Sequence, residues 1–98
     1  MGEKEVRIKI TQHASNDLES LYEYITQDNP AAAKKTILKV LDAIESLKAF
    51  PTIGRSGRLP YTRELVISGT PFIVIYQIKE DIIFVIRVYH ASRRWPPG

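Results

Sequence analysis

The chain has 98 residues, 44% of them hydrophobic, and no cysteine. This length predicts a single domain over residues 1–98, because two domains would each be too small to bury a core. The composition excludes a disordered chain, a disulfide scaffold, a thiol nucleophile and a cysteine-based zinc site. No apolar run approaches the ~18 residues that span a bilayer, and the N-terminus lacks the apolar core of a signal peptide. We therefore expect a cytoplasmic protein with no metal and no other cofactor.

The charge is distributed unevenly along the chain. The whole sequence carries 14 basic and 11 acidic side chains, for a formal net charge of +3. Residues 53–98 hold seven basic and three acidic side chains, and six of those seven are arginines. Arginine stays protonated and presents a planar fork that matches phosphate oxygens. A basic half of this kind indicates a polyanionic partner such as nucleic acid, although a solubilising surface would give the same pattern.

The first half of the chain predicts one strand followed by two helices. Apolar and charged residues alternate over residues 6–10, which is the period of a half-buried strand. Thr11 can cap a helix with one apolar face, and we place Asp17 on its solvent side. Asp28-Asn29-Pro30 ends this helix and starts a second, which should stop near Ala49. Two amphipathic helices joined by a short turn predict an αα-hairpin.

The second half predicts a loop and then three strands. Residues 51–60 contain two prolines and two glycines and are expected to form a loop that exposes Arg55 and Arg58. Short turns separate three apolar strand candidates, which therefore form antiparallel hairpins: residues 62–67, 72–78 and 82–89. The predicted order is β-α-α-β-β-β in the α+β class, with the helical hairpin packed on one face of a small sheet. The last two strands should be central, and the other face should stay open to solvent.

The candidates for chemistry gather near the end of the last strand. Arg87 interrupts an apolar run, so it must face a solvated groove or pair with an acid such as Glu64. His90 follows three residues later, and the two side chains share a face only if the chain bends near Tyr89. Arginines could neutralise phosphate in a transition state, and His90 could transfer a proton. An ordinary strand-end histidine bonded to a carbonyl is the alternative for His90. The candidate catalytic set is Arg63, Arg87, His90 and Arg93.

A second group of basic and aromatic side chains could bind nucleic acid through phosphate contacts and base stacking. Trp95 could equally anchor the tail on a helix. No phosphate-binding loop, serine-hydrolase elbow or zinc-protease motif is present. The candidate nucleic-acid-binding set is Arg55, Arg58, Arg94, Tyr61, Tyr89 and Trp95.

Three stretches, in this order, resemble the RelE/ParE superfamily of type II toxin–antitoxin toxins. Residues 25–33 (ITQDNPAAA) resemble the turn "YI..DNP.AA" between the first two helices of that family. Residues 50–55 (FPTIGR) resemble its "P..GR" loop. The third stretch resembles the pattern "TRELV…Y…V.H..R.WP", and consists of residues 62–66, Tyr76 and residues 88–96.

The resemblance implies a growth-inhibiting toxin that is held inactive by a cognate antitoxin. RelE-like members cleave mRNA in the ribosomal A site without a metal, whereas ParE-like members poison DNA gyrase and are not nucleases. Our first reading is the ribosome-dependent nuclease, in which Arg63, Arg87 and Arg93 neutralise phosphate and His90 is the general acid. The alternative is a gyrase inhibitor without chemistry. In either case we expect the antitoxin to cover the hairpin or the sheet rim and to occlude Arg87 or the tail.

Overall fold

A computed structural model describes residues 5–92 of the chain. The two helices are α1 (Gln12–Asp28) and α2 (Pro30–Ser46). The strands are β1 (Arg7–Ile10), β2 (Arg55–Ser56), β3 (Arg63–Val66), β4 (Phe72–Lys79) and β5 (Ile82–His90). The predicted sites Arg93, Arg94 and Trp95 lie outside the described residues.

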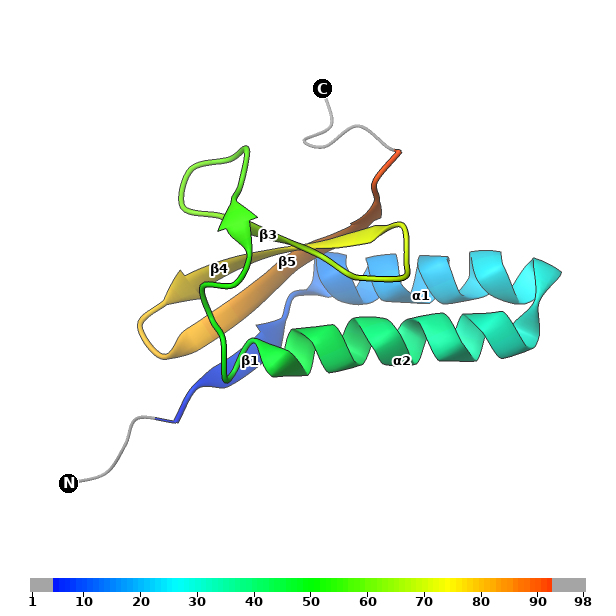
Figure 1. Cartoon of the computed structure of the whole chain (residues 1–98), viewed down its shortest axis with the longest axis horizontal. Coiled ribbons are helices and arrows are strands. Elements are labelled where there is room, and N and C mark those ends of the chain that lie inside the picture. The colour runs from blue at the N-terminus through cyan, green and yellow to red at the C-terminus, as the bar shows by residue number, and fades with distance from the viewer. Residues whose placement is uncertain (1–4, 93–98) are drawn as a thin grey trace.

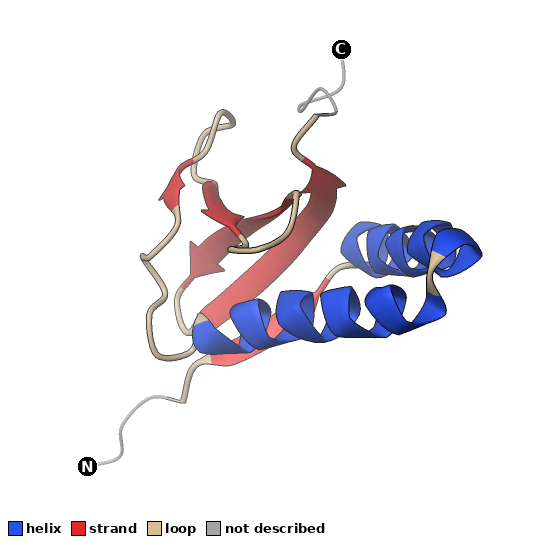
Figure 2. Cartoon of the chain, turned by 45° about the vertical axis from the view of Figure 1, so that its right-hand side comes forward, coloured by secondary structure: helices blue, strands red, loops and turns tan. Residues whose placement is uncertain are grey.

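The strands form one mixed sheet in the order β1-β5-β4-β3-β2. β1 runs parallel to β5, while the other neighbours are antiparallel. Both helices cover the same face of this sheet (Figures 1 and 2). The α+β class, the helical hairpin on one face and the central position of β4 and β5 are therefore confirmed. The expected loop over residues 51–60 was wrong in one respect, because it contains β2, which pairs with β3.

Capping residues set the ends of the helical hairpin. The Thr11 hydroxyl accepts a hydrogen bond from the backbone N–H of Ala14, at 3.2 Å. The Asn29 side chain accepts one from Ala32 N–H at 3.1 Å, and its own N–H donates to Ile25 of the preceding helix. One asparagine thus ends α1 and starts α2, with Pro30 in the first turn. α2 ends at Ser46 and continues as a turn, so the predicted end near Ala49 was three residues late.

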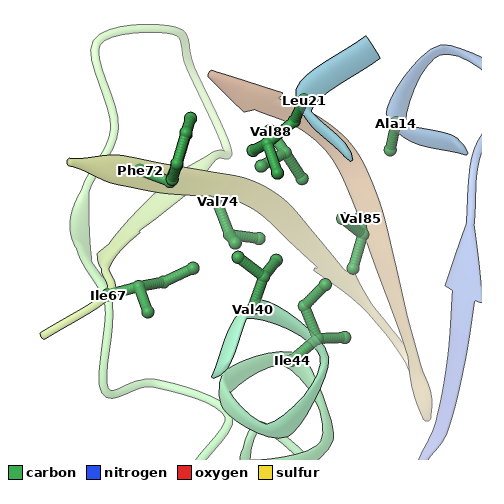
Figure 3. Close-up of a cluster of buried hydrophobic side chains, with 9 residues drawn as sticks. All are labelled: Ala14, Leu21, Val40, Ile44, Ile67, Phe72, Val74, Val85 and Val88. Carbon is green, nitrogen blue, oxygen red and sulfur yellow. The ribbon is translucent and has the colours of Figure 1, made fainter. Parts of the chain in front are cut away.

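The main core lies between the hairpin and the sheet (Figure 3). Alternate residues of β4 and β5 point toward the helices, which contribute small and aliphatic side chains. Ala14 and Val40, for example, are fully buried. A smaller cluster continues this layer around Leu47, Tyr76 and Ile83. The cluster drawn in Figure 3 consists of Ala14, Leu21, Val40, Ile44, Ile67, Phe72, Val74, Val85 and Val88.

The opposite face of the sheet was expected to be open, and this was wrong. Glu64, Ile73 and Ile75 point to that face by register, and their exposed fractions are 2%, 5% and 0%. The backbone N–H of Arg58 donates to the Glu64 carboxylate at 3.1 Å, so the chain after β2 folds back onto this face. The physical reason is that β4 is apolar on both sides and must be covered on both.

Candidate functional site

Arg87 is held by an acid on the first helix. Its Nε lies 2.7 Å from Asp17 Oδ2, and its Nη2 lies 2.9 Å from Asp17 Oδ1. The hydrogen bond to Asp17 raises the pKa of Arg87 above its ordinary value, although partial burial lowers that pKa. The sequence offered Glu64 as the acid that pairs with Arg87, and this prediction was wrong. Glu64 is on β3 and Arg87 is on β5, and β4 lies between these strands.

Asp17 was expected on the solvent side of its helix, and this too was wrong. Its carboxylate also accepts a hydrogen bond from the backbone N–H of Val88, at 3.0 Å. The signal that could have placed it is its spacing, three residues after Ala14 and four before Leu21, which are both buried. Those spacings put Asp17 at the edge of the buried face.

Glu64 instead organises the segment after β2. Its Oε1 lies 3.2 Å from Arg55 Nη2, and its Oε2 accepts the hydrogen bond from Arg58 N–H. A buried carboxylate needs such partners, because an uncompensated charge in the interior is costly. Arg55 is exposed, as predicted, yet its charge is matched by this carboxylate.

Arg63 lies on the helix-covered face, opposite Tyr76 in the sheet. Its Nη1 donates to the carbonyl oxygens of Gly54 at 2.8 Å and Thr52 at 3.2 Å. The buried Tyr76 hydroxyl donates to the Pro51 carbonyl at 2.7 Å and accepts from Gly54 N–H at 2.9 Å. Arg63 and Tyr76 together hold the loop of residues 51–54 against the sheet. A Cβ on Gly54 would lie 2.7 Å from the Tyr76 oxygen, so glycine is required there.

His90 is fixed by its neighbours at the end of β5. Its ring packs edge-on against Phe72, with the ring centroids 5.5 Å apart. The backbone N–H of Ser92 donates to Nδ1 at 3.1 Å, and the Ser92 hydroxyl lies 2.7 Å from the same nitrogen. Because an N–H can only donate, Nδ1 acts as the acceptor and Nε2 carries the proton of the neutral ring.

Arg87 and His90 point to opposite faces of the sheet. The pairing with β4 runs without interruption from Ile75–Arg87 to Phe72–His90. The irregularity in β5 falls before Arg87, at Ile86, rather than near Tyr89. An odd separation in a regular strand places two side chains on different faces. The bend needed to bring these two residues together is therefore absent between them.

Tyr89 and Tyr61 sit in contrasting surroundings. Burial raises the pKa of Tyr89 above its ordinary value, and the charge of Glu64 raises it further, whereas Arg58 and Arg55 lower it. The Tyr89 hydroxyl oxygen is inaccessible to solvent, although the residue as a whole is partly exposed. The Tyr61 side chain is 88% exposed, and its backbone adopts a left-handed φ of 64°.

The structure thus does not bring the described members of the candidate catalytic set, Arg63, Arg87 and His90, together at one site. By strand register, Arg63 and His90 point to the helix-covered face, whereas Arg87 starts from the other face and its guanidinium meets Asp17 of α1. Arg87 and Arg63 are also committed to hydrogen bonds with the protein itself. Arg55, Arg58 and Tyr89 do lie near one another, around Glu64. Within residues 5–92, no helix is long and apolar enough to cross a membrane.

Comparison with known proteins gives the family. The family model of the ParE toxin of the type II toxin–antitoxin system parDE matches residues 8–95. Putative toxin Y4kP of Sinorhizobium fredii is 37% identical over 90 residues, which are 92% of this chain and 93% of that protein. Toxin RelE2 of Caulobacter vibrioides is 32% identical over 83 residues, which are 85% of this chain and 92% of that protein.

Solved structures show the same fold. A chain of the chromosomal ParDE system from P. aeruginosa has a TM-score of 0.81 at 24% identity, covering 88% of this chain and 96% of that one. A chain of the RelBE2 toxin–antitoxin complex from Mycobacterium tuberculosis has a TM-score of 0.65 at 20% identity, covering 89% and 99%. The resemblance to the RelE/ParE superfamily is therefore confirmed, and the chain belongs to the ParE toxin family of type II toxin–antitoxin systems.

Proposed function

We propose that this toxin inhibits growth by binding DNA gyrase, as the ParE-like alternative implies, and that it performs no chemistry on RNA. The observation that supports this most strongly is the engagement of Arg87 by Asp17 and of Arg63 by two loop carbonyls. The match to the ParE toxin model over residues 8–95 favours the same reading. The toxin would meet gyrase in the cytoplasm.

Metal-free RNA cleavage requires a different arrangement of cationic and proton-transferring side chains. Cations must converge on the phosphate whose charge grows in the transition state, and a proton-transfer group must be within hydrogen-bond reach of the same site. Here Arg63 and Arg87, the two described arginines of the candidate catalytic set, start from opposite faces of the sheet by register. One nitrogen of His90 is already occupied by Ser92. The ribosome-dependent nuclease, our first reading of the sequence, is thus less well supported by the geometry.

The test is to run two assays on the same purified toxin. Added in equimolar amount to gyrase with supercoiled plasmid and ATP, it should cause cleaved plasmid to accumulate. Added to ribosomes programmed with a defined mRNA, it should leave the message intact. Cleavage of the message in the A site, together with undisturbed gyrase, would reverse the assignment in favour of the nuclease.

We also propose how the cognate antitoxin, the partner that the family implies, is bound. Large apolar side chains are exposed on both helices of the hairpin, including Tyr22 on α1 and Leu38 and Leu41 on α2. An amphipathic helix of the antitoxin could bury its apolar stripe there. A structure of the complex in which the hairpin, the sheet rim and Arg87 are all uncovered would refute this arrangement.

A further inference from the structure

We infer that the tip of the loop between β2 and β3, formed by Leu59, Pro60 and Tyr61, docks into an apolar pocket on the protein that this toxin inhibits. The inference rests on the proposed function, since it names the part of the toxin that makes the inhibitory contact. We call these three residues the 59–61 tip.

The 59–61 tip presents apolar side chains to solvent. All three residues are exposed, and Tyr61, at 88%, is the most exposed large hydrophobic side chain of residues 5–92. The loop that carries the tip projects away from the two helices in both views of the molecule (Figures 1 and 2). Tyrosine is one of the residue types that are enriched among the anchors of protein interfaces.

Hydrogen bonds at the base of the loop hold the tip in one conformation. Gly57 N–H donates to the Thr62 carbonyl at 2.7 Å, and the Thr62 hydroxyl donates to the Leu59 carbonyl at 2.6 Å. A Cβ on Gly57 would lie 2.1 Å from the Thr62 hydroxyl oxygen, so the two sides of the loop are in close contact. Such a loop loses little conformational freedom when it binds a partner.

The backbone conformation of Tyr61 is a second, independent reason to infer that its side chain contacts a partner. Its φ of 64° is in the left-handed region, which disfavours a residue with a bulky side chain. A glycine or asparagine would satisfy that conformation at lower cost. Strained positions of this kind cluster at binding sites. The tyrosine side chain contributes little packing at 88% exposure, so its presence points to a contact made outside the chain.

The charges around the tip favour a protein over a nucleic acid as its partner. Arg55 is matched by Glu64, and Arg63 is turned inward onto two carbonyl oxygens. Arg58 is the exposed cation beside the tip, and its backbone N–H donates to Glu64. The 59–61 tip itself carries no charge. Binding to nucleic acid relies mainly on cations that neutralise phosphates, whereas an uncharged Leu-Pro-Tyr tip fits an apolar pocket. The three tip residues also form part of the wall of a shallow depression, which is lined by residues 56–63 and Ile78 and would receive the rim of that pocket.

The experiment compares Tyr61→Ala, Tyr61→Gly and Tyr61→Phe with the wild-type toxin, at matched expression in cells lacking the antitoxin. Loss of an anchor of this kind weakens binding by about 30-fold or more. We expect Tyr61→Ala and Tyr61→Gly to need about 30-fold more toxin for the same growth inhibition, and Tyr61→Phe to resemble wild type. Tyr61→Gly should keep the thermal unfolding temperature, because glycine relieves the left-handed backbone. Tyr24→Ala, which removes another tyrosine with 67% exposure, should leave growth inhibition unchanged.

Three outcomes would overturn the inference, and a fourth would overturn only the proposed target. Full toxicity of Tyr61→Ala would exclude the tip from the inhibitory contact. A 30-fold loss of antitoxin affinity with full toxicity would assign the tip to the antitoxin. Binding of a DNA or RNA oligonucleotide by wild type that is lost in Tyr61→Ala would make the tip a stacking site for nucleic acid. If wild-type toxin leaves gyrase undisturbed but Tyr61→Ala still loses toxicity, the gyrase proposal fails while the inference holds for another protein target.

Discussion

Two arginines of the described residues, Arg63 and Arg87, serve as multiple hydrogen-bond donors. Arg87 makes two parallel bonds to one carboxylate, and Arg63 bridges two main-chain carbonyls. A lysine could not reproduce either arrangement, because it lacks the planar fork. The preference for arginine over lysine in the second half of the chain therefore has a structural cause as well as the electrostatic one first inferred.

Replacement of Arg63 should affect stability before it affects activity. Arg63→Ala removes the donor for the carbonyls of Thr52 and Gly54 and should lower the free energy of unfolding by about 1–3 kcal/mol. Arg63→Lys should recover only part of this loss. Urea denaturation of the variants measures the effect, and growth inhibition of the same variants is the control. Loss of toxicity in Arg63→Ala with unchanged stability would show a direct role for this guanidinium.

Tyr89 should make the fold sensitive to alkaline pH. Its pKa in the folded chain is raised above the ordinary value of 10.0, chiefly by burial. Above that ordinary value the unfolded chain loses a proton that the folded chain keeps, so deprotonation favours unfolding. The stabilisation is complete below about pH 10 and is lost as the pH rises through the folded-state pKa.

Comparison with Tyr89→Phe, which cannot ionise at this position, isolates this contribution. The unfolding free energy of wild type, measured between pH 8 and pH 11, should fall more steeply than that of Tyr89→Phe. Equal slopes for the two proteins would show that Tyr89 ionises at the same pH in the folded and unfolded chains.

At the scale of elements, the start of α1 forms hydrogen bonds with the part of β5 that β1 is too short to reach. β1 pairs with β5 only as far as Val85. Beyond that point, the Thr11 hydroxyl donates to the Ile86 carbonyl at 3.1 Å, and Asp17 accepts from Val88 N–H. The first turns of α1 therefore satisfy polar groups along the edge of β5 that a longer β1 would otherwise have bonded. This is why the helix begins directly after the strand and why its acid faces the sheet.

The contact between Asp17 and β5 should be a major stabilising link of α1 to the sheet. Asp17→Ala leaves the partly buried Arg87 without this carboxylate and removes the acceptor of Val88 N–H, so we expect a loss of about 2–4 kcal/mol. Asp17→Asn keeps an acceptor oxygen and should lose less. A double-mutant cycle with Arg87→Gln, followed by thermal or urea unfolding, gives the pairwise term. Additive losses in the cycle would contradict the coupling of the two side chains.

The sequence could predict those features that depend on neighbouring residues. Thr11 and Asn29-Pro30 mark helix ends locally, and alternation over residues 6–10 marks a strand. The partner of Arg87 is 70 residues away, and no local pattern identifies it. The position of the bulge at Ile86 is equally invisible in an apolar run, yet it decides which residues share the face of Arg87.

At the scale of the whole molecule, the two proposed contact surfaces are well separated. Figure 1 shows the helical hairpin on one side of the sheet, extending beyond it, and the loop after β2 on the other. An antitoxin seated on the hairpin and a target bound at the 59–61 tip would thus use different elements of a small fold. The sheet lies between the two surfaces. Hydrogen bonds of Asp17 connect it to α1, and hydrogen bonds of Arg63 and Tyr76 connect it to the loop of residues 51–54.

On the proposed mechanism, inhibition needs binding and not proton transfer by His90. The most direct measurement is growth inhibition by His90→Phe, at matched expression and with its unfolding temperature checked against wild type. Phenylalanine keeps a ring against Phe72 but cannot act as a general acid. We predict undiminished toxicity. A loss of ~100-fold or more in a stably folded His90→Phe variant, the size expected for a general acid, would contradict it.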